Sequence, residues 1–187
     1  MYLFKSITDE IKSARLVFNN YSKPKRLVLA ALFASIAAVL QAAGGFLPVL
    51  GYLISPFATA PILLCSILSL PLGAMAYFLT NLMLLILQPS ELIVFPFTTG
   101  LLGLGTGVAF YFFNKRLTII AVGASFLSLG ILSLLYVFTF PVLGPVVSSS
   151  FSLLTAGAIF LFSFIYNWIW VDIGLILLKR LKKTIPK

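Results

Sequence analysis

Histidine is absent from the 187 residues of this sequence, and cysteine occurs once, as Cys65 inside an apolar run. Without histidine the chain has no imidazole to ligate a metal or to act as a general base. This excludes intramembrane proteases that depend on Ser–His pairs or on zinc held by His and Glu. A single cysteine excludes an intramolecular disulfide. We therefore expect no enzyme, no metal site and no cofactor.

Charged side chains are also scarce. They make up 9% of the residues, whereas hydrophobic residues make up 61% and the mean hydropathy is +1.14. Soluble domains carry about 25% charged residues. A soluble fold of this size cannot bury so much apolar surface, so most of the chain must lie in lipid. The composition predicts an all-α integral membrane protein.

Long apolar runs separated by turn residues predict a bundle of six transmembrane helices. We expect these spans at about 27–43, 58–70, 72–87, 92–113, 117–140 and 151–178. Several are shorter than the ~20 residues that a perpendicular helix needs, which predicts tilted or broken helices. Pro71 and Gly73 indicate a tight turn between the second and third spans. One long bent helix with a re-entrant piece is the alternative there.

Basic residues flank the predicted spans and account for the net charge of +9. They are Lys5, Lys12, Arg15, Lys23, Lys25, Arg26, Lys115, Arg116, Lys179, Arg180, Lys182, Lys183 and Lys187. With six spans these residues share one side, which the positive-inside rule assigns to the cytoplasm together with both termini. The outer connections, 44–57, 88–91 and 141–150, carry no positive charge. The first and third are apolar enough to fold back against the bundle.

No internal repeat or low-complexity linker divides the chain, which predicts one membrane domain. We expect a cytoplasmic amphipathic segment at 1–26, the six-span domain at 27–183 and a basic tail at 184–187. In the first segment, Ile7, Ile11, Ala14 and Phe18 fall on one face of a short helix. That helix is expected to lie on the cytoplasmic membrane surface.

Alanine recurs at every fourth position of the first span, at Ala30, Ala34, Ala38 and Ala42. Such a stripe of small residues on one face of a membrane helix lets another backbone approach closely. The alanine ladder therefore predicts a docking face. Its occupant is either another subunit or the later helices of the same chain.

Acidic residues beyond the N-terminal segment are limited to Glu91 and Asp172. A carboxylate inside a span is costly, so Asp172 is expected to pair with a basic residue near the cytoplasmic end or to have a functional role. The available partners are Lys179, Lys115 and Arg116. Glu91 starts the fourth span, where a negative charge suits a helix N-terminus; contact with an external ligand is the alternative. Two isolated carboxylates do not form a proton relay, which argues against a proton-coupled pump.

Polar and aromatic side chains toward the outer side are the candidates for a small-molecule site. Taken singly, each amide or hydroxyl is best interpreted as an interhelical hydrogen bond, and aromatic residues equally well anchor a helix at the interface. Together they suit a flat, mostly uncharged organic molecule. The predicted substrate-binding residues are Gln41, Phe46, Tyr52, Gln88, Glu91, Phe95, Tyr136 and Asn167.

In layout, residues 26–183 resemble the substrate-binding S component of an energy-coupling factor (ECF) vitamin transporter. The six spans, the alanine ladder, the long apolar first outer connection and the segment FSFIYN at 162–167 carry the resemblance. A lysine often seen a turn after an asparagine in the last span of that family is replaced here by Trp170. This difference argues against a site built around an anionic substrate group.

The resemblance implies a subunit that captures a vitamin-like molecule outside a prokaryotic cell with high affinity. It implies partners, namely a transmembrane coupling protein and two cytoplasmic ATPases, with the alanine ladder as the docking face. No phosphate-binding loop motif occurs in the sequence, so ATP hydrolysis would belong to a partner. The alternative is a small multi-pass structural or regulatory protein of the cell envelope without a ligand of its own.

Overall fold

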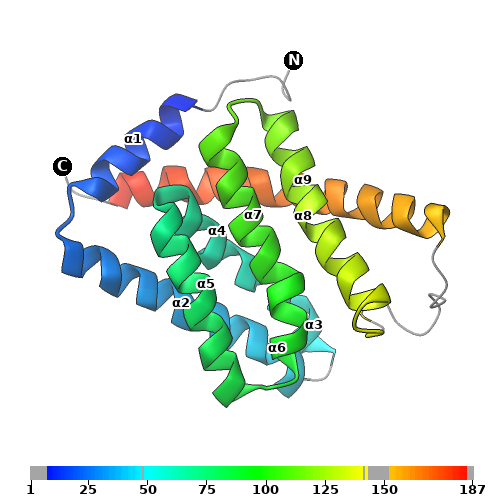
Figure 1. Ribbon diagram of the computed structural model, residues 1–187. Coiled ribbons are helices and arrows are strands. Elements are labelled where there is room, and N and C mark those ends of the chain that lie inside the picture. The colour runs from blue at the N-terminus through cyan, green and yellow to red at the C-terminus, as the bar shows by residue number, and fades with distance from the viewer. Residues whose placement is uncertain (1–7, 48, 141, 143–151, 185–187) are drawn as a thin grey trace.

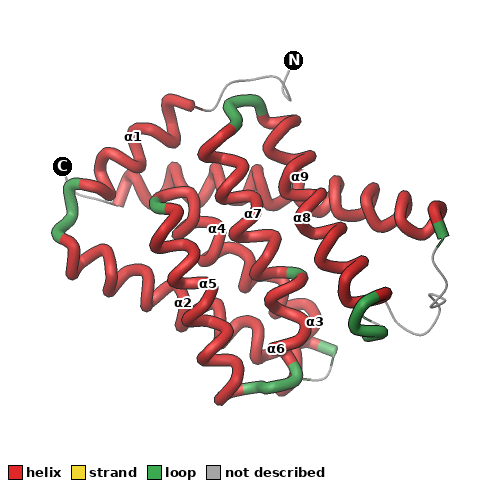
Figure 2. The backbone as a smooth tube through the Cα atoms, in the orientation of Figure 1, coloured by secondary structure: helices red, strands yellow, loops and turns green. Residues whose placement is uncertain are grey.

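A computed structural model describes residues 8–47, 49–140, 142 and 152–184, and all regular secondary structure in these residues is helical (Figure 1). Its elements are α1 (Thr8–Asn19), α2 (Lys23–Phe46), α3 (Leu50–Ile54), η2 (Ser55–Ala58), α4 (Thr59–Leu68), α5 (Leu70–Leu87), α6 (Glu91–Val94), η3 (Phe95–Phe97), α7 (Thr99–Phe112), α8 (Arg116–Tyr136) and α9 (Leu153–Thr184). Figure 2 shows that short connections join most of them.

Six of the helical segments are long and apolar enough to cross a membrane. They are Lys23–Phe46, Leu50–Leu68, Leu70–Leu87, Glu91–Phe112, Arg116–Tyr136 and Leu153–Leu181. The described residues thus contain six candidate membrane-spanning helices, which is the number predicted and the pattern of a multi-pass membrane protein. The third outer connection predicted at 141–150 lies, except for Val142, outside the described residues.

The helices form two layers around α4. In Figure 1, α5, α7 and α8 lie side by side, and α2 and α9 cross behind them. Helix α4 packs against α2, α5, α7 and α9, and all of its residues except Ala60 are buried. The apolar core is therefore built around this short, enclosed helix.

The alanine ladder of α2 is buried inside the chain. Ala34 and Ala38 are 0% exposed, and Ala30 and Ala42 are 1% and 3% exposed. Helix α5 packs along α2, and the Thr80 hydroxyl donates a 3.2 Å hydrogen bond to the carbonyl oxygen of Ala34. Such a bond requires close backbones, which small residues permit. The chain's own helices thus cover the ladder, which is one of the two occupants expected for it.

Two of the six spans are interrupted by a proline-containing 3-10 turn. Turn η2, with Pro56 in its first turn, joins α3 to α4, and turn η3, with Pro96, joins α6 to α7. The predicted outer connection 44–57 is consequently wrong in extent, because α2 continues to Phe46 and the second span begins at Leu50. Proline is tolerated in the first turn of a helix, so Pro56 changes the helix type without ending the span.

The tight turn predicted between the second and third spans is confirmed. Helix α4 ends at Leu68 and α5 begins at Leu70, with Pro71 in its first turn. Ser69 between them is extended, with φ −154° and ψ 114°. The two spans are therefore separate helices joined by a single residue.

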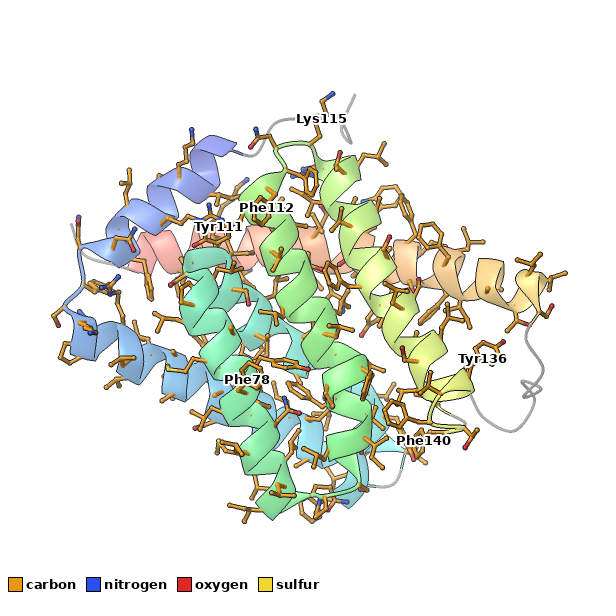
Figure 3. The ribbon with its side chains drawn as sticks, in the orientation of Figure 1. Phe78, Tyr111, Phe112, Lys115, Tyr136 and Phe140 are labelled. Carbon is orange, nitrogen blue, oxygen red and sulfur yellow. The ribbon has the colours of Figure 1, made fainter. Side chains whose placement is uncertain are left out.

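Basic residues gather at the end of the bundle where α2 and α8 begin and where α4, α7 and α9 end; we call this the basic end. Among its members are Lys12, Arg15, Lys23, Lys25, Arg26, Lys115, Arg116, Lys179 and Arg180. In Figure 3, Lys115 lies at this end of α8, whereas Tyr136 lies at the other. The opposite end, where α2 ends and α6 begins, is called the Glu91 end.

Helix α1 packs against the basic end through an apolar face. Ile11, Ala14 and Phe18 are buried in a cluster with residues of α4 and α9. These residues belong to the face predicted from the sequence; Ile7, its fourth member, lies outside the described residues. Burial of this face fixes α1 against the spans.

Arg15 of α1 caps two helices at the basic end. Its Nε donates a 2.8 Å hydrogen bond to the carbonyl oxygen of Ile67, and its Nη2 donates a 3.3 Å bond to that of Phe110. These carbonyls belong to the last turns of α4 and α7, where no intrahelical donor remains. The guanidinium also lies 3.5 Å from the centroid of the Tyr111 ring. Burial lowers the pKa of Arg15, and the neighbouring Tyr111 acts in the opposite direction.

We expect Ala34→Leu to destabilise the fold itself. Leucine at this fully buried position pushes α2 away from α5, and such overpacking costs about 1–3 kcal/mol. As a control, Val39→Phe adds volume on the face of α2 that the chain leaves uncovered and should change stability by less than ~0.5 kcal/mol. Thermal unfolding in detergent measures both variants. Wild-type stability of Ala34→Leu would contradict the internal packing of the ladder.

We expect Arg15→Met to release α1 from the bundle. The variant keeps an apolar stem but leaves two helix-terminal carbonyls without their charged donor, at a cost of about 1–3 kcal/mol. Limited proteolysis between α1 and α2 should then become faster. Lys12→Met, at an exposed position of the same helix, is the matched control. Equal cleavage rates for the two variants would show that Arg15 does not hold α1.

Candidate functional site

A hydrogen-bond network joins α2, α6 and α7 at the Glu91 end. Gln41 Nε2 donates a 2.7 Å bond to Glu91 Oε2, and Thr99 Oγ1 donates a 2.7 Å bond to Gln41 Oε1. Gln41 is 1% exposed, and Glu91 and Thr99 are partly buried. We call these three residues the Glu91 network. Because a carboxylate only accepts, it must face the amide nitrogen of Gln41, which leaves the amide oxygen for Thr99.

The network lies where the two interrupted spans meet the end of α2. Glu91 opens the single turn of α6, and Thr99 opens α7 after the break at η3. Thr98 between them has φ −121° and ψ −99°, which are not helical values. Helix α3 and turn η2 of the other interrupted span also pack against α2. The break at η3 thus brings Glu91 and Thr99, which flank it in the sequence, to the side chain of Gln41.

Two glycines at the end of α2 make room for these side chains. A Cβ atom at Gly44 would lie 2.9 Å from Glu91 Oε1, and a Cβ atom at Gly45 would overlap the side chain of Gln88. Gln88 in turn donates a 3.1 Å hydrogen bond to the hydroxyl of Ser90. The structure therefore brings together three predicted site residues, Gln41, Gln88 and Glu91.

Phe95 supports the break next to the network. It is 0% exposed and stacks on Tyr77 with 5.8 Å between ring centroids. The Tyr77 hydroxyl donates a 3.0 Å bond to the carbonyl oxygen of Pro96. Phe95 was predicted to bind substrate, but the chain covers it completely. In the structure, the Phe95 side chain packs in the interior and holds η3 in position.

Three other predicted site residues lie outside the network. Phe46 and Tyr52 are 61% and 72% exposed on the surface at the Glu91 end. Tyr136, at the end of α8, packs in a separate apolar cluster with Ile159 and Trp170 (Figure 3). No hydrogen bond joins these aromatic residues to the Glu91 network in the part of the chain that the structure describes.

Asn167, which was predicted to bind substrate, is enclosed in the interior by the chain's own helices. It is 0% exposed and accepts a 2.8 Å hydrogen bond from the Thr106 hydroxyl. Its own Nδ2 donates a 2.9 Å bond to the carbonyl oxygen of Ile120. Gly123 gives the amide its space, since a Cβ there would overlap it. Asn167 ties α7, α8 and α9 together, as an interhelical amide is expected to do.

Asp172 forms an ion pair near the basic end. Its Oδ1 lies 3.2 Å from Arg116 Nη1, and the two side chains are 30% and 10% exposed. The favoured prediction for this carboxylate, pairing with one of the nearby basic residues, is confirmed. A partly buried pair of this kind satisfies both charges within the protein.

Thr99 is the network member that sequence reasoning did not select. A hydroxyl in an apolar helix usually bonds a carbonyl one turn earlier in the same helix. Thr98, just before α7, makes the equivalent bond to a residue four positions earlier, with 2.7 Å to the carbonyl oxygen of Val94 at the end of α6. The signal for Thr99 is its place just after Pro96, where a break redirects the hydroxyl toward α2.

No protein-family model, curated protein or solved structure matches this chain.

We expect Thr99→Val to destabilise the protein more than Thr98→Val. The first variant leaves the buried amide oxygen of Gln41 without its donor, at a cost of about 1–3 kcal/mol. The second removes only a bond within one helical segment, which is the matched control. Thermal unfolding in detergent compares the two. Equal midpoints would show that the network does not join α2 to α7.

Proposed function

We propose that this protein is the membrane-embedded, substrate-binding subunit of an uptake transporter for a vitamin-like small molecule. The observation that carries the proposal is the Glu91 network at the meeting point of two interrupted spans. Interrupted helices are typical of transporter substrate sites, because polar groups become available there inside an otherwise apolar bundle. Gln88 and Glu91 supply a donor and an acceptor for the substrate, and the buried Gln41 positions Glu91.

The charge distribution supports an inward transport direction in this proposal. By the positive-inside rule the basic end faces the cytoplasm, with both termini, and the Glu91 end faces the outside of a prokaryotic plasma membrane. Anionic lipids of the inner leaflet add attraction at the basic end. A substrate arriving from outside then meets the network first.

The energy for uptake is assigned to partners, namely a transmembrane coupling protein and two cytoplasmic ATPases. The sequence has no phosphate-binding loop, so it cannot use ATP alone. Of the two carboxylates within spans, Asp172 is ion-paired with Arg116, which leaves no proton relay. Because the chain's own helices cover the alanine ladder, the docking surface is proposed to be a different face.

A structural or regulatory membrane protein without a ligand is the second candidate. The observation that favours it is the burial of the alanine ladder, because packing between helices of the same chain then accounts for the ladder without a partner. The Glu91 network favours the transporter subunit, because a packing bundle has no need for a carboxylate at this place.

We expect the purified protein to bind a small water-soluble molecule at the Glu91 end. Thermal unfolding in mild detergent, measured with a panel of cationic, neutral and anionic vitamins, should show one compound that raises the midpoint. A ligand at a hundred times its Kd stabilises by about 2.7 kcal/mol. Affinity purification from the native membrane should also recover ATPase subunits. A panel without any stabilising compound, together with a purified protein free of bound small molecules, would reject the proposal.

A further inference from the structure

We propose that the substrate bound at the Glu91 end is an organic cation, such as an ammonium compound, and that the Glu91 carboxylate is its counterion. This inference rests on the proposed function and adds the class of substrate to it. Its basis is a carboxylate held in place at an end of the molecule that has no basic side chain.

The sequence leaves Glu91 without a basic partner. No lysine or arginine occurs between Arg26 and Lys115 or between Arg116 and Lys179, and histidine is absent. These four residues belong to the basic end, across the bundle from Glu91. Within the described residues no ion pair involves Glu91, whereas Asp172 is paired with Arg116 at 3.2 Å. The two carboxylates of the spans therefore differ in whether the chain neutralises them.

The hydrogen bond from Gln41 holds the Glu91 carboxylate in place. Because the amide of Gln41 is neutral, the negative charge of Glu91 remains uncompensated. Gln41 donates to Oε2 at 2.7 Å, and Oε1 faces Gly44, where a Cβ atom would lie 2.9 Å from it. Helix α6 has four residues, too few for a strong dipole at its N-terminus. A partly buried carboxylate without a counterion is costly in a membrane protein. A bound cation offsets this cost through a charge-assisted hydrogen bond.

The surrounding side chains suit an organic cation better than a metal ion. Calcium is held by several carboxylate and carbonyl oxygens, and zinc by His or Cys. No group of three or more His, Cys, Asp or Glu gathers among the residues that the structure describes. One carboxylate beside the amide of Gln88 and the hydroxyl of Ser90 matches one ammonium group with polar substituents. This revises the expectation of a mostly uncharged ligand.

The test compares small molecules of different charge, and variants of Glu91 that keep or remove its negative charge. Wild-type protein in lipid nanodiscs is assayed by equilibrium dialysis against the vitamin panel sorted by charge. Two matched sets are added: choline with its uncharged isostere 3,3-dimethylbutan-1-ol, and benzylammonium with benzyl alcohol and benzoate. Glu91→Gln keeps the size of the side chain and an oxygen that accepts from Gln41, but removes the charge. Glu91→Asp keeps the charge, and Ile93→Ala, at an exposed apolar position of the same helix, is the neighbouring control.

We expect the wild type to retain cationic compounds and to reject their uncharged and anionic counterparts. Glu91→Gln should weaken retention about tenfold or more, which corresponds to ~1.4 kcal/mol. Glu91→Asp should retain more than Glu91→Gln, and Ile93→Ala should behave as the wild type. The charge selectivity of the wild type is informative even where a variant fails to fold.

Three results would overturn the inference. Retention of a neutral or anionic compound, or of a cation with equal affinity in Glu91→Gln, rejects the cationic substrate but leaves the proposed binding function in place. Retention of no compound at all rejects the proposed function and the inference with it.

Discussion

Lipid offers no hydrogen-bond partner, so each polar side chain within a span has to find one inside the chain. The helix contacts of this protein follow from that constraint. Thr80 joins α5 to the Ala34 carbonyl of α2, and Asn167 joins α7, α8 and α9. Gln41 joins α6 and α7 to α2. Small residues stand beside these bonds because the donors reach across only where backbones are close. In this protein, the need of polar side chains for a hydrogen-bond partner and the close packing of helices at small residues therefore occur together.

The sequence predicted the parts of the fold that depend on composition and charge. Apolar length predicted six spans, and the cost of a bare carboxylate predicted the pairing of Asp172, which the Arg116 contact confirms. The sequence-based prediction failed where two different structures are compatible with the same composition. An apolar stretch at 44–57 is the same for a re-entrant loop and for a helix, and Pro56 fits the first turn of either a new helix or a continued span. A stripe of alanines likewise does not reveal whether the facing helix belongs to the same chain.

The candidate site was predicted residue by residue but not as an assembly. Gln41 and Glu91 stand out as polar groups toward the outer end, yet they are 50 positions apart and nothing local indicates their bond. Asn167 looks equally suitable as a ligand contact, and only its complete burial assigns it to helix packing. The break at Thr98 decides the role of Thr99, and a break of this kind results from packing around η3 rather than from the hydroxyl itself. Tertiary contacts therefore determine which polar residues form the network.

The charge of Glu91 is more than the network itself requires. Gln41 needs an acceptor for its amide, and a neutral glutamine or serine oxygen at position 91 would supply one without the desolvation cost of a carboxylate. A negative charge at the N-terminus of α6 also adds little stability, because α6 has only four residues. For the second carboxylate within a span, Asp172 near the basic end, the fold provides Arg116 as a partner. The fold thus neutralises Asp172 but leaves Glu91 without a counterion at the meeting point of two interrupted spans. The charge of Glu91 is therefore available to a ligand from outside the chain.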